Sequence, residues 1–279
     1  MEKARLKSVE LEYETVGTGE PLLLITCGPI AGGFLPLMSA GALQDDYQLI
    51  RYHRRGMRGS TSTGPPTTFA EHAADAAELL GYLGVPSAHV VGHSTGALVG
   101  LQLALDHPRL VHSLALLEPP LIAAPGAAAF MERVGSSAAK YAAGDREAAM
   151  ADFLSLVSGL EWGMCAVIDE YVPRGVAQAV DDADNFFGSE LPALNTWHFG
   201  STEAETISQP VLSVLGTQTE AWFVGGHDLL HSWFPQVEDL TIGGVGHLLH
   251  MQRPNRVAQG LAEFLARHRL SRVLVSRKN

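Results

Sequence analysis

The chain has 279 residues, of which 46% are hydrophobic, and it carries a formal net charge of −11 at pH 7. This length and apolar content predict one large globular domain, or a core with an insertion, and argue against intrinsic disorder. The acidic charge, with only one short basic stretch (RYHRRGMR), leads us to expect no nucleic-acid-binding surface.

Neither a signal peptide nor a membrane span is evident in the sequence. The N-terminus alternates apolar and polar residues, and no apolar stretch approaches the roughly 18 residues that a bilayer span needs. The two cysteines, Cys27 and Cys165, have neither the number nor the spacing of a disulfide framework or a metal site. We therefore expect a cytoplasmic protein with free thiols and no membrane contact, with a single Cys27–Cys165 bridge as the alternative.

Short apolar segments alternate with helical patterns along most of the chain. Strands are predicted, in chain order, at residues 9–15, 22–26, 47–53, 88–92, 112–118, 210–216 and 237–243. A helix follows the third strand and begins with a capping box, in which Thr68 precedes Glu71 by three residues. Another helix follows the fourth strand, and the last covers about 255–268. This alternation predicts an α/β fold with a mostly parallel, twisted sheet and helices on both faces.

The alternation stops between residues 120 and 206, where the sequence shows helices and loops without a clear strand. We expect a core of residues 1–119 and 207–279, with 120–206 inserted as a helical cap. The aromatic residues of this segment have two interpretations: they pack within the insertion, or they face a ligand beneath a lid. The residues proposed to line such a pocket are Trp162, Phe186, Phe187 and Trp197.

The stretch HVVGHSTGALVG places a serine between two glycines, where an apolar strand ends and a helix begins. Residues 92–96 read Gly-His-Ser-Thr-Gly and match the G-x-S-x-G pattern of a nucleophile elbow. Small residues two positions before and after the serine permit the tight turn that exposes its hydroxyl. We therefore expect Ser94 to be a nucleophile at the carboxyl edge of the sheet, with an ordinary glycine-rich turn as the alternative.

A serine hydroxyl needs a base, which we expect at another strand end later in the chain. His247 lies just beyond the last predicted strand and, among the 12 histidines, is the one with this placement. His250 follows three residues later and is expected to point away into the next turn. A surface histidine without a role is the alternative interpretation of His247.

The chain resembles the α/β-hydrolase-fold proteins over nearly its full length. The matching segments are LLLITCG, YHRRGMRGS, GHSTG, PVLSVLG and GGVGHLLHMQRP. The resemblance implies a catalytic triad in the chain order serine, acid, histidine. It also implies that residues 120–206 correspond to the cap insertion of that fold.

The acid departs from the pattern of most relatives, which carry it as Gly-x-x-Asp after the penultimate strand. Residues 216–219 read Gly-Thr-Gln-Thr here, so threonine stands in the aspartate position. A carboxylate at the end of a buried strand is costly without a partner, which favours Glu118, in LEPP. This placement resembles that of certain fungal lactonases of the same fold. Glu220 and Asp228 are the alternatives, and a purely structural ion pair is the alternative role for Glu118.

Two backbone N–H groups are expected to form an oxyanion hole. One belongs to Thr95, directly after the nucleophile, and the other comes from the loop after the second predicted strand. Relatives read His-Gly-x in this loop with x as the donor, whereas this chain reads Cys27-Gly28-Pro29, and proline has no N–H. We expect Gly28 to donate, with the turn at 30–31 as the alternative.

Two other histidine positions have candidate roles. His53 stands where relatives often carry aspartate, which makes it a candidate for the floor of the substrate pocket. His227 and His231 have the i, i+4 spacing of zinc-binding helices. Because the sequence shows no third ligand beside them, we expect a solvated helix face and no metal site.

These features together predict a cofactor-free serine hydrolase whose partner is a small hydrophobic ester or lactone. Ser94 would attack the carbonyl group, with His247 as base and Glu118 as acid, while Gly28 and Thr95 hold the oxyanion. The aromatic insertion and the low charged fraction of 18% favour an uncharged substrate. The alternatives are a C–C bond hydrolase or a cofactor-independent dioxygenase on the same fold, and a non-catalytic ligand receptor. A homodimer is a further hypothesis.

Overall fold

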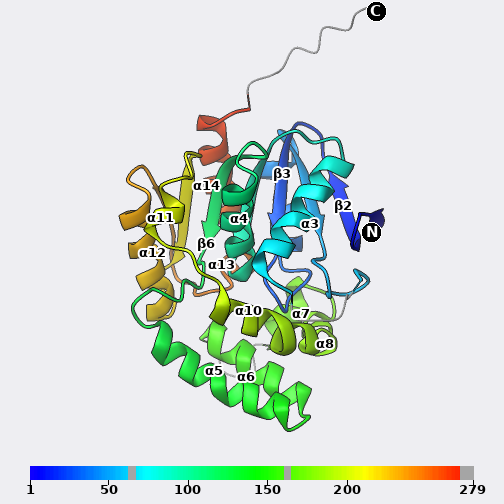
Figure 1. The fold of residues 1–279 in the computed structure, drawn as a ribbon, viewed down its shortest axis with the longest axis vertical. Helices are drawn as coiled ribbons and strands as arrows, with labels where there is room; N and C mark the ends of the chain where they lie inside the picture. The colour runs from blue at the N-terminus through cyan, green and yellow to red at the C-terminus, as the bar shows by residue number, and fades with distance from the viewer. Residues whose placement is uncertain (62–66, 160–164, 271–279) are drawn as a thin grey trace, which may run out of the picture.

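The computed structural model describes residues 1–61, 67–159 and 165–270, and an eight-stranded sheet organises them (Figure 1). β1 and β2 pair in antiparallel fashion, as do β2 and β4, and the strands from β4 to β8 in the sheet run parallel. The predicted mostly parallel sheet is therefore confirmed, and every predicted strand is present. The strands in spatial order are β1 (Glu2–Arg5), β2 (Glu10–Val16), β4 (Tyr47–Tyr52), β3 (Glu20–Ile25), β5 (Ala88–His93), β6 (Val111–Leu117), β7 (Val211–Gly216) and β8 (Glu238–Ile242).

β1 is the strand that the sequence pattern misses. Its four residues, EKAR, bury only Ala4, so it shows no apolar run. It joins the sheet through backbone pairing with β2, in which Ala4 lies opposite Leu11. A short, charged edge strand of this kind blunts the sheet edge without presenting an alternating pattern to find.

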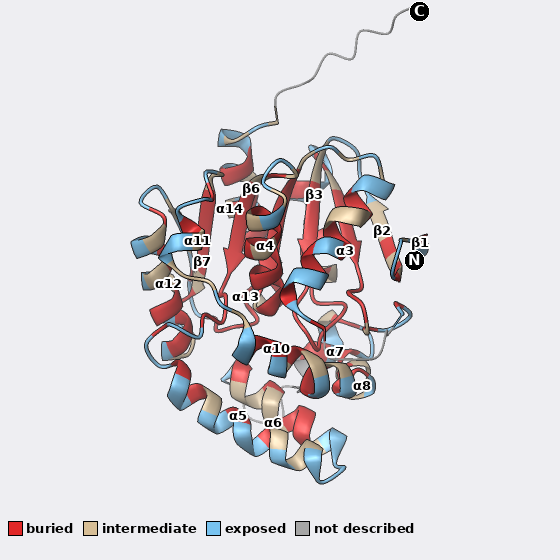
Figure 2. Ribbon diagram, in the orientation of Figure 1, coloured by how far each residue is buried: buried red, intermediate tan, exposed pale blue. Residues whose placement is uncertain are grey.

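Alternate residues of the central strands point to opposite faces of the sheet and build two separate cores. In β5, Val90 packs on one face and Val91 on the other. The strands are consequently buried on both sides, as the red arrows of Figure 2 show. The first face is covered by α3 (Phe69–Tyr82) and α4 (Thr95–Asp106), and the second by α1 (Leu35–Met38), α2 (Gly41–Gln44), α13 (Leu249–Gln252) and α14 (Pro254–Arg267).

Local signals place the helices of the core correctly. α3 begins with the predicted capping box, because the Thr68 hydroxyl accepts from the Glu71 N–H and the Glu71 carboxylate accepts from the Thr68 N–H. α14 begins at Pro254 and ends at Arg267, within one residue of each predicted end. Among the described residues, no helix combines the length and the apolar character required to traverse a bilayer.

The described chain between β6 and β7 forms helices and no strand, and most of them lie beyond the sheet edge at which the parallel strands finish (Figure 1). We call residues 120–206 the helical segment. A third apolar cluster, which includes Ile30, Phe186 and Leu248, joins this segment to the loops after β3 and β8. Its helices are α5 (Ala127–Ala142), α6 (Arg146–Ser158), α7 (Cys165–Tyr171), α8 (Gly175–Asp181), α9 (Ala183–Asn185), the π-helix η2 (Phe186–Glu190), α10 (Leu191–Thr196) and α11 (Ser201–Ala204).

Candidate active site

Ser94 sits in a strained turn between β5 and α4. Its φ of 53° and ψ of −126° are dihedrals that L-residues rarely adopt, and such strain is concentrated at functional sites. The turn is possible because both flanking glycines lack a side chain. A Cβ on Gly92 would lie 2.5 Å from Ala97 Cα, and one on Gly96 would lie 2.1 Å from the Ile25 carbonyl oxygen. The sequence therefore folds locally into an elbow that holds the serine at the end of the sheet.

Glu118 and His247 meet at the same sheet edge, although 129 residues separate them. The Nδ1–H of His247 donates to Glu118 Oε2 at 2.8 Å, and both side chains are buried. Glu118 also accepts from the Gly216 N–H and from the Thr219 hydroxyl, each at 2.8 Å. Thr219 is the residue that occupies the usual aspartate position, and here it supports a carboxylate that comes from the neighbouring strand.

The two alternative acids lie elsewhere. Glu220 accepts two hydrogen bonds from the Arg133 guanidinium of α5, at 3.0 and 3.2 Å. Asp228 is exposed on α12 (Ala221–Trp233). Of these three candidate carboxylates, Glu118 is the one that touches the His247 ring.

Uncharged rings surround His247 on the protein side. Phe223 stacks on its imidazole, with ring centroids 4.0 Å apart, and the His93 Nε2–H donates to its backbone oxygen at 2.9 Å. Burial lowers the pKa of His93 far below its usual range and lowers the pKa of His250 to about 3. Both neighbouring imidazoles are therefore neutral at pH 7, and neither opposes a positive charge on His247.

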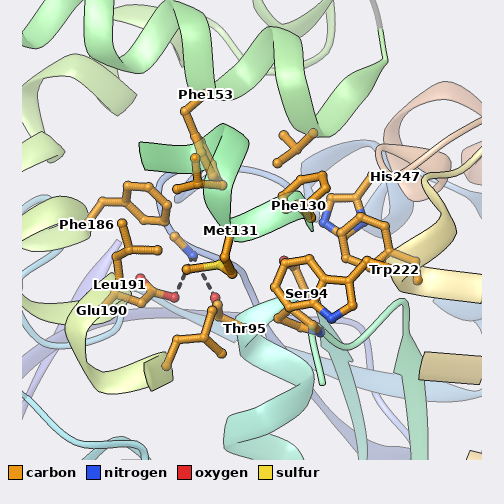
Figure 3. A pocket seen from close by; sticks show the side chains of 16 residues that line it. Ser94, Thr95, Phe130, Met131, Phe153, Phe186, Glu190, Leu191, Trp222 and His247 are labelled. Atoms are coloured by element: carbon orange, nitrogen blue, oxygen red, sulfur yellow. Dashed lines mark hydrogen bonds between the residues drawn. The ribbon is translucent and has the colours of Figure 1, made fainter. Parts of the chain in front are cut away.

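Ser94 and His247 line one cavity (Figure 3). The structure places the serine hydroxyl and the imidazole on the same cavity without a hydrogen bond between them. In unliganded sites such hydrogen bonds are often long and tighten only when substrate binds. Because Nδ1 carries the proton given to Glu118, Nε2 is the ring nitrogen free to accept a proton.

Most of the cavity wall is apolar and comes from the helical segment and from α12. Phe186, proposed as a pocket residue, does line it, and the sequence did not single out the other wall residues. In the sequence each of them looks like an ordinary buried position or one on an amphipathic helix. Only the folded structure shows that they face one cavity. The other apolar side chains of the wall are Phe130, Met131, Val134, Phe153, Val157, Leu191, Leu194, Trp222 and Phe223.

Phe187 and Trp197 do not line the cavity, contrary to expectation. Phe187 stacks on Tyr141, with ring centroids 5.0 Å apart, and so packs within the helical segment. The Trp197 indole N–H donates to Gln102 on α4 at 2.8 Å, which fixes the tryptophan against the core. For these two residues the packing interpretation of the aromatic side chains holds.

His53 is not among the residues that line the cavity, contrary to expectation. Its ring contacts the Glu12 carboxylate at 2.9 Å and an Arg51 guanidinium nitrogen at 3.3 Å. The neighbouring strand β2 therefore holds this side chain in a polar contact. The fourth aromatic candidate, Trp162, lies outside the described residues.

The expected oxyanion donors flank the nucleophile. Thr95 is the first residue of α4, so its N–H has no acceptor within the helix. The Gly28 N–H points to Thr95 Oγ1 and to Glu190 Oε1, 3.3 Å from each. Gly28, Ser94, Thr95 and Glu190 all line the cavity, so both expected donors belong to residues on the same cavity as the serine.

Glu190 and Arg54 are the charged residues of this region that the sequence analysis missed. Glu190 is a cavity residue at the end of η2, and the Arg54 guanidinium donates to it at 2.7 Å. A glutamate in a helical segment is normally expected to face solvent. Arg54 belongs to a basic stretch whose sequence predicts a turn. No local signal predicts that residues 136 apart form a buried pair.

Comparison with known proteins gives a family match that covers most of the chain. The sequence model described as "alpha/beta hydrolase fold" matches residues 20–254. A protein named "Putative carbamate hydrolase RutD" from Enterobacter cloacae is 38% identical over 97 residues, and its namesake from Klebsiella pneumoniae is 37% identical over 110 residues. These matches cover 34% and 38% of this chain, and 36% and 41% of the relatives. The matched part is therefore well under half the length of those relatives.

Solved structures share the fold at low sequence identity. An enol-lactonase from Burkholderia xenovorans superposes with a TM-score of 0.77 at 22% identity, over 95% of this chain and 100% of that one. A thermophilic esterase from Thermogutta terrifontis gives a TM-score of 0.78 at 20% identity, over 96% of this chain and 100% of that one. Est816, described as an N-acyl homoserine lactone degrading enzyme, gives 0.71 at 22% identity, over 94% and 100%. At these identities the likeness concerns the fold.

Proposed function

The chain belongs to the alpha/beta hydrolase fold family, and on that premise we propose that it is a cofactor-free serine hydrolase of small hydrophobic carboxylic esters or lactones. The observation that carries the proposal is the His247 ring, held by Glu118 on one side and facing the cavity of Ser94 on the other. An activated nucleophile needs this arrangement of base and orienting acid.

In the proposed first step, Ser94 Oγ bonds to the carbonyl carbon while its proton passes to His247 Nε2. The carbonyl π electrons move to oxygen, and the N–H groups of Thr95 and Gly28 stabilise that charge. Glu118 keeps Nδ1 protonated and faces the positive charge that forms on the ring. The bond to the leaving alkoxide then breaks, the alkoxide takes the proton from Nε2, and the acyl-enzyme remains.

In the second step, water gives a proton to His247 Nε2 as its oxygen attacks the acyl carbon. The same two N–H groups hold the second oxyanion. Collapse breaks the bond to Ser94 Oγ, which takes the proton back, and the acid leaves. No group beyond the protein and water is needed for this balance.

The choice of an ester or lactone rests on the apolar cavity wall and on the activities for which other proteins of this fold are described. Aromatic and aliphatic side chains form most of the wall, which suits an uncharged, apolar substrate. The solved structures with this fold include ones described as an enol-lactonase, an esterase and a lactone-degrading enzyme. We propose that the helical segment, residues 120–206, acts as the cap that supplies this wall.

Covalent labelling tests the proposal directly. A fluorophosphonate probe is expected to add once per chain, at Ser94, as determined by intact mass and peptide mapping. The Ser94→Ala variant is the control, and it should take up no probe while melting as the wild type does. Labelling at another residue, or none in a folded wild type, would show that Ser94 is not an activated nucleophile.

A further inference from the structure

One ion pair lies inside the apolar region around the cavity. Glu190 and Arg54 join at 2.7 Å, and each side chain is 1% exposed. A buried pair of this kind costs several kcal/mol in desolvation unless further hydrogen bonds satisfy its atoms. Here they are incomplete, because Glu190 Oε2 and the Arg54 Nε and Nη1 atoms have no hydrogen-bond partner among the described residues.

The carboxylate of this pair lies beside the reacting centre. Glu190 lines the cavity together with Ser94, and its Oε1 accepts from the Gly28 N–H at 3.3 Å. It reaches that position because Gly28 has no side chain: a Cβ there would lie 1.9 Å from Glu190 Oε2. If the ion pair only attached the helical segment to the core, its carboxylate would not need to contact the N–H of Gly28, which is an expected oxyanion donor.

We propose that Glu190 is a specificity-determining residue, whose carboxylate accepts a hydrogen bond from a hydroxyl or amide N–H on the acyl group of the substrate. This proposal rests on the serine hydrolase function proposed above. The carboxylate would then supply a polar contact that orients the ligand against a mostly apolar wall. The positive charge of Arg54 balances the negative charge of the Glu190 carboxylate. The repulsion between this carboxylate and an oxyanion that forms nearby is thereby reduced.

The position of Gly28 limits where the substrate carries this donor. A carbonyl oxygen held by its N–H lies about 2.9 Å from that nitrogen, and the nitrogen is 3.3 Å from Glu190 Oε1. The carbonyl oxygen and the carboxylate are thus within about 6 Å of each other. A hydroxyl or amide on the α- or β-carbon of the acyl chain spans this gap, so the substrate class is an α- or β-substituted ester or lactone with a hydrogen-bond donor.

A matched pair of substrates tests the proposal. For the wild type, kcat/KM for p-nitrophenyl 3-hydroxybutyrate should exceed that for p-nitrophenyl butyrate by at least about tenfold. Glu190→Gln, which weakens the acceptor, should bring this ratio toward one, and the double variant Arg54→Met with Glu190→Leu should abolish the preference. The double variant removes both charges, so neither is left buried alone.

Asp182→Asn is the control variant. Asp182 accepts from the Arg58 N–H at 3.1 Å and so also attaches the helical segment to the core, but it lies outside the cavity. Its variant should keep the wild-type ratio even if it melts at a lower temperature. A ratio near one in the wild type, or one that Glu190→Gln leaves unchanged while lowering the melting temperature, would show that the pair is only an attachment point.

Labelling separates this proposal from the function on which it rests. If Ser94 labels normally but the ratio is near one, the specificity role is wrong and the serine chemistry stands. If Ser94 does not label, the binding of 3-hydroxybutyramide and butyramide measured by calorimetry replaces the kinetic ratio. Tighter binding of the hydroxyamide in the wild type, lost in Glu190→Gln, would support the subsite, and equal binding would overturn it.

A second inference comes from a separate cluster of side chains at the C-terminal half of α12. His231 Nε2 lies 2.9 Å from Asp239 Oδ1 of β8, and His227 Nε2 lies 3.7 Å from the same oxygen. One ligand atom from each of these residues lies within 4.8 Å of the others. His227 Nδ1 is paired with Ser213 Oγ at 2.8 Å, which aims Nε2 at Asp239, as an outer partner orients a metal-binding histidine.

We infer that His227, His231 and Asp239 form a surface site for a divalent transition-metal ion such as Zn²⁺. The third ligand that the sequence did not reveal comes from the strand after the helix. Two imidazoles and one carboxylate are a ligand set that Zn²⁺ accepts, with water in the fourth position. A bound ion would join α12 to β8 away from the cavity.

Calorimetric titration of the untagged protein with Zn²⁺ tests this site. The wild type should bind one ion at pH 7.5 and melt at a higher temperature in its presence. His231→Ala and Asp239→Asn should each weaken binding by about 100-fold or more. His198→Ala, which removes an exposed histidine outside the cluster, should bind as the wild type does. Equal affinity in the wild type and His231→Ala would overturn the site.

Discussion

Glu118→Gln is expected to lower kcat for ester hydrolysis by about 10³- to 10⁴-fold. The carboxylate accepts three hydrogen bonds, from His247 Nδ1–H, the Thr219 hydroxyl and the Gly216 N–H. An amide has one acceptor oxygen and an NH₂ group, so it cannot accept all three. The imidazole would then turn to the tautomer that carries its proton on Nε2, where it cannot take the proton of Ser94. Steady-state kinetics with p-nitrophenyl butyrate measure the loss.

Glu220→Gln is the matched control, because it changes the next acidic residue after the aspartate-like position. Glu220 pairs with Arg133 on α5, and we expect kcat to stay within about twofold of the wild type. Thermal melting of both variants separates a catalytic defect from unfolding. Comparable losses of kcat in the two folded variants would contradict the assignment of the acid to Glu118.

The parts of the site that the sequence could predict are those that local chain geometry determines. An apolar strand that ends in Gly-His-Ser-Thr-Gly and continues as a helix has few other structures, so Ser94 was placed correctly at the sheet edge. Carboxyl ends of parallel strands meet at one edge, which brings Glu118 and His247 together despite their separation in sequence. The catalytic roles themselves stay predictions until the variants are measured.

The residues that sequence reasoning misplaced depend on long-range packing. An aromatic side chain in a helical insertion has no sequence mark that says whether it faces the cavity, as Phe186 does, or a neighbouring helix, as Phe187 does. His53 was assigned by analogy with an aspartate position, but the β2 carboxylate beside it decides its contact. Glu190 and Arg54 are visible only once the helical segment is folded onto the core.

The sheet and the helical segment contribute different parts of the candidate site. The sheet and its turns hold Ser94, Glu118 and His247 in strained or buried positions. The helical segment, together with α12, supplies most of the apolar cavity wall. We therefore expect substitutions in the wall to alter which ester is preferred, and substitutions in the elbow to affect every ester alike.

Gly96→Ala is expected to lower the free energy of unfolding by about 3 kcal/mol or more, because the added methyl group meets backbone on the neighbouring strand. Its Cβ would lie 2.1 Å from the Ile25 carbonyl oxygen and 2.7 Å from that of Thr26. Neither atom can turn aside as a flexible side chain would, so α4 and the end of β3 must separate. That end of β3 leads into Gly28, so the same shift should also disturb the oxyanion donors and lower kcat.

Urea unfolding followed by circular dichroism measures the change, with Gly135→Ala as the matched control. Gly135 is exposed in the middle of α5, and a Cβ there meets nothing within 4 Å. Alanine should therefore raise stability by up to about 1 kcal/mol, because it has the higher helix propensity. If Gly96→Ala instead unfolded within about 0.5 kcal/mol of the wild type, α4 would not approach β3 as closely as the elbow requires. The strained placement of Ser94, from which its role as nucleophile is argued, would then lose its structural basis.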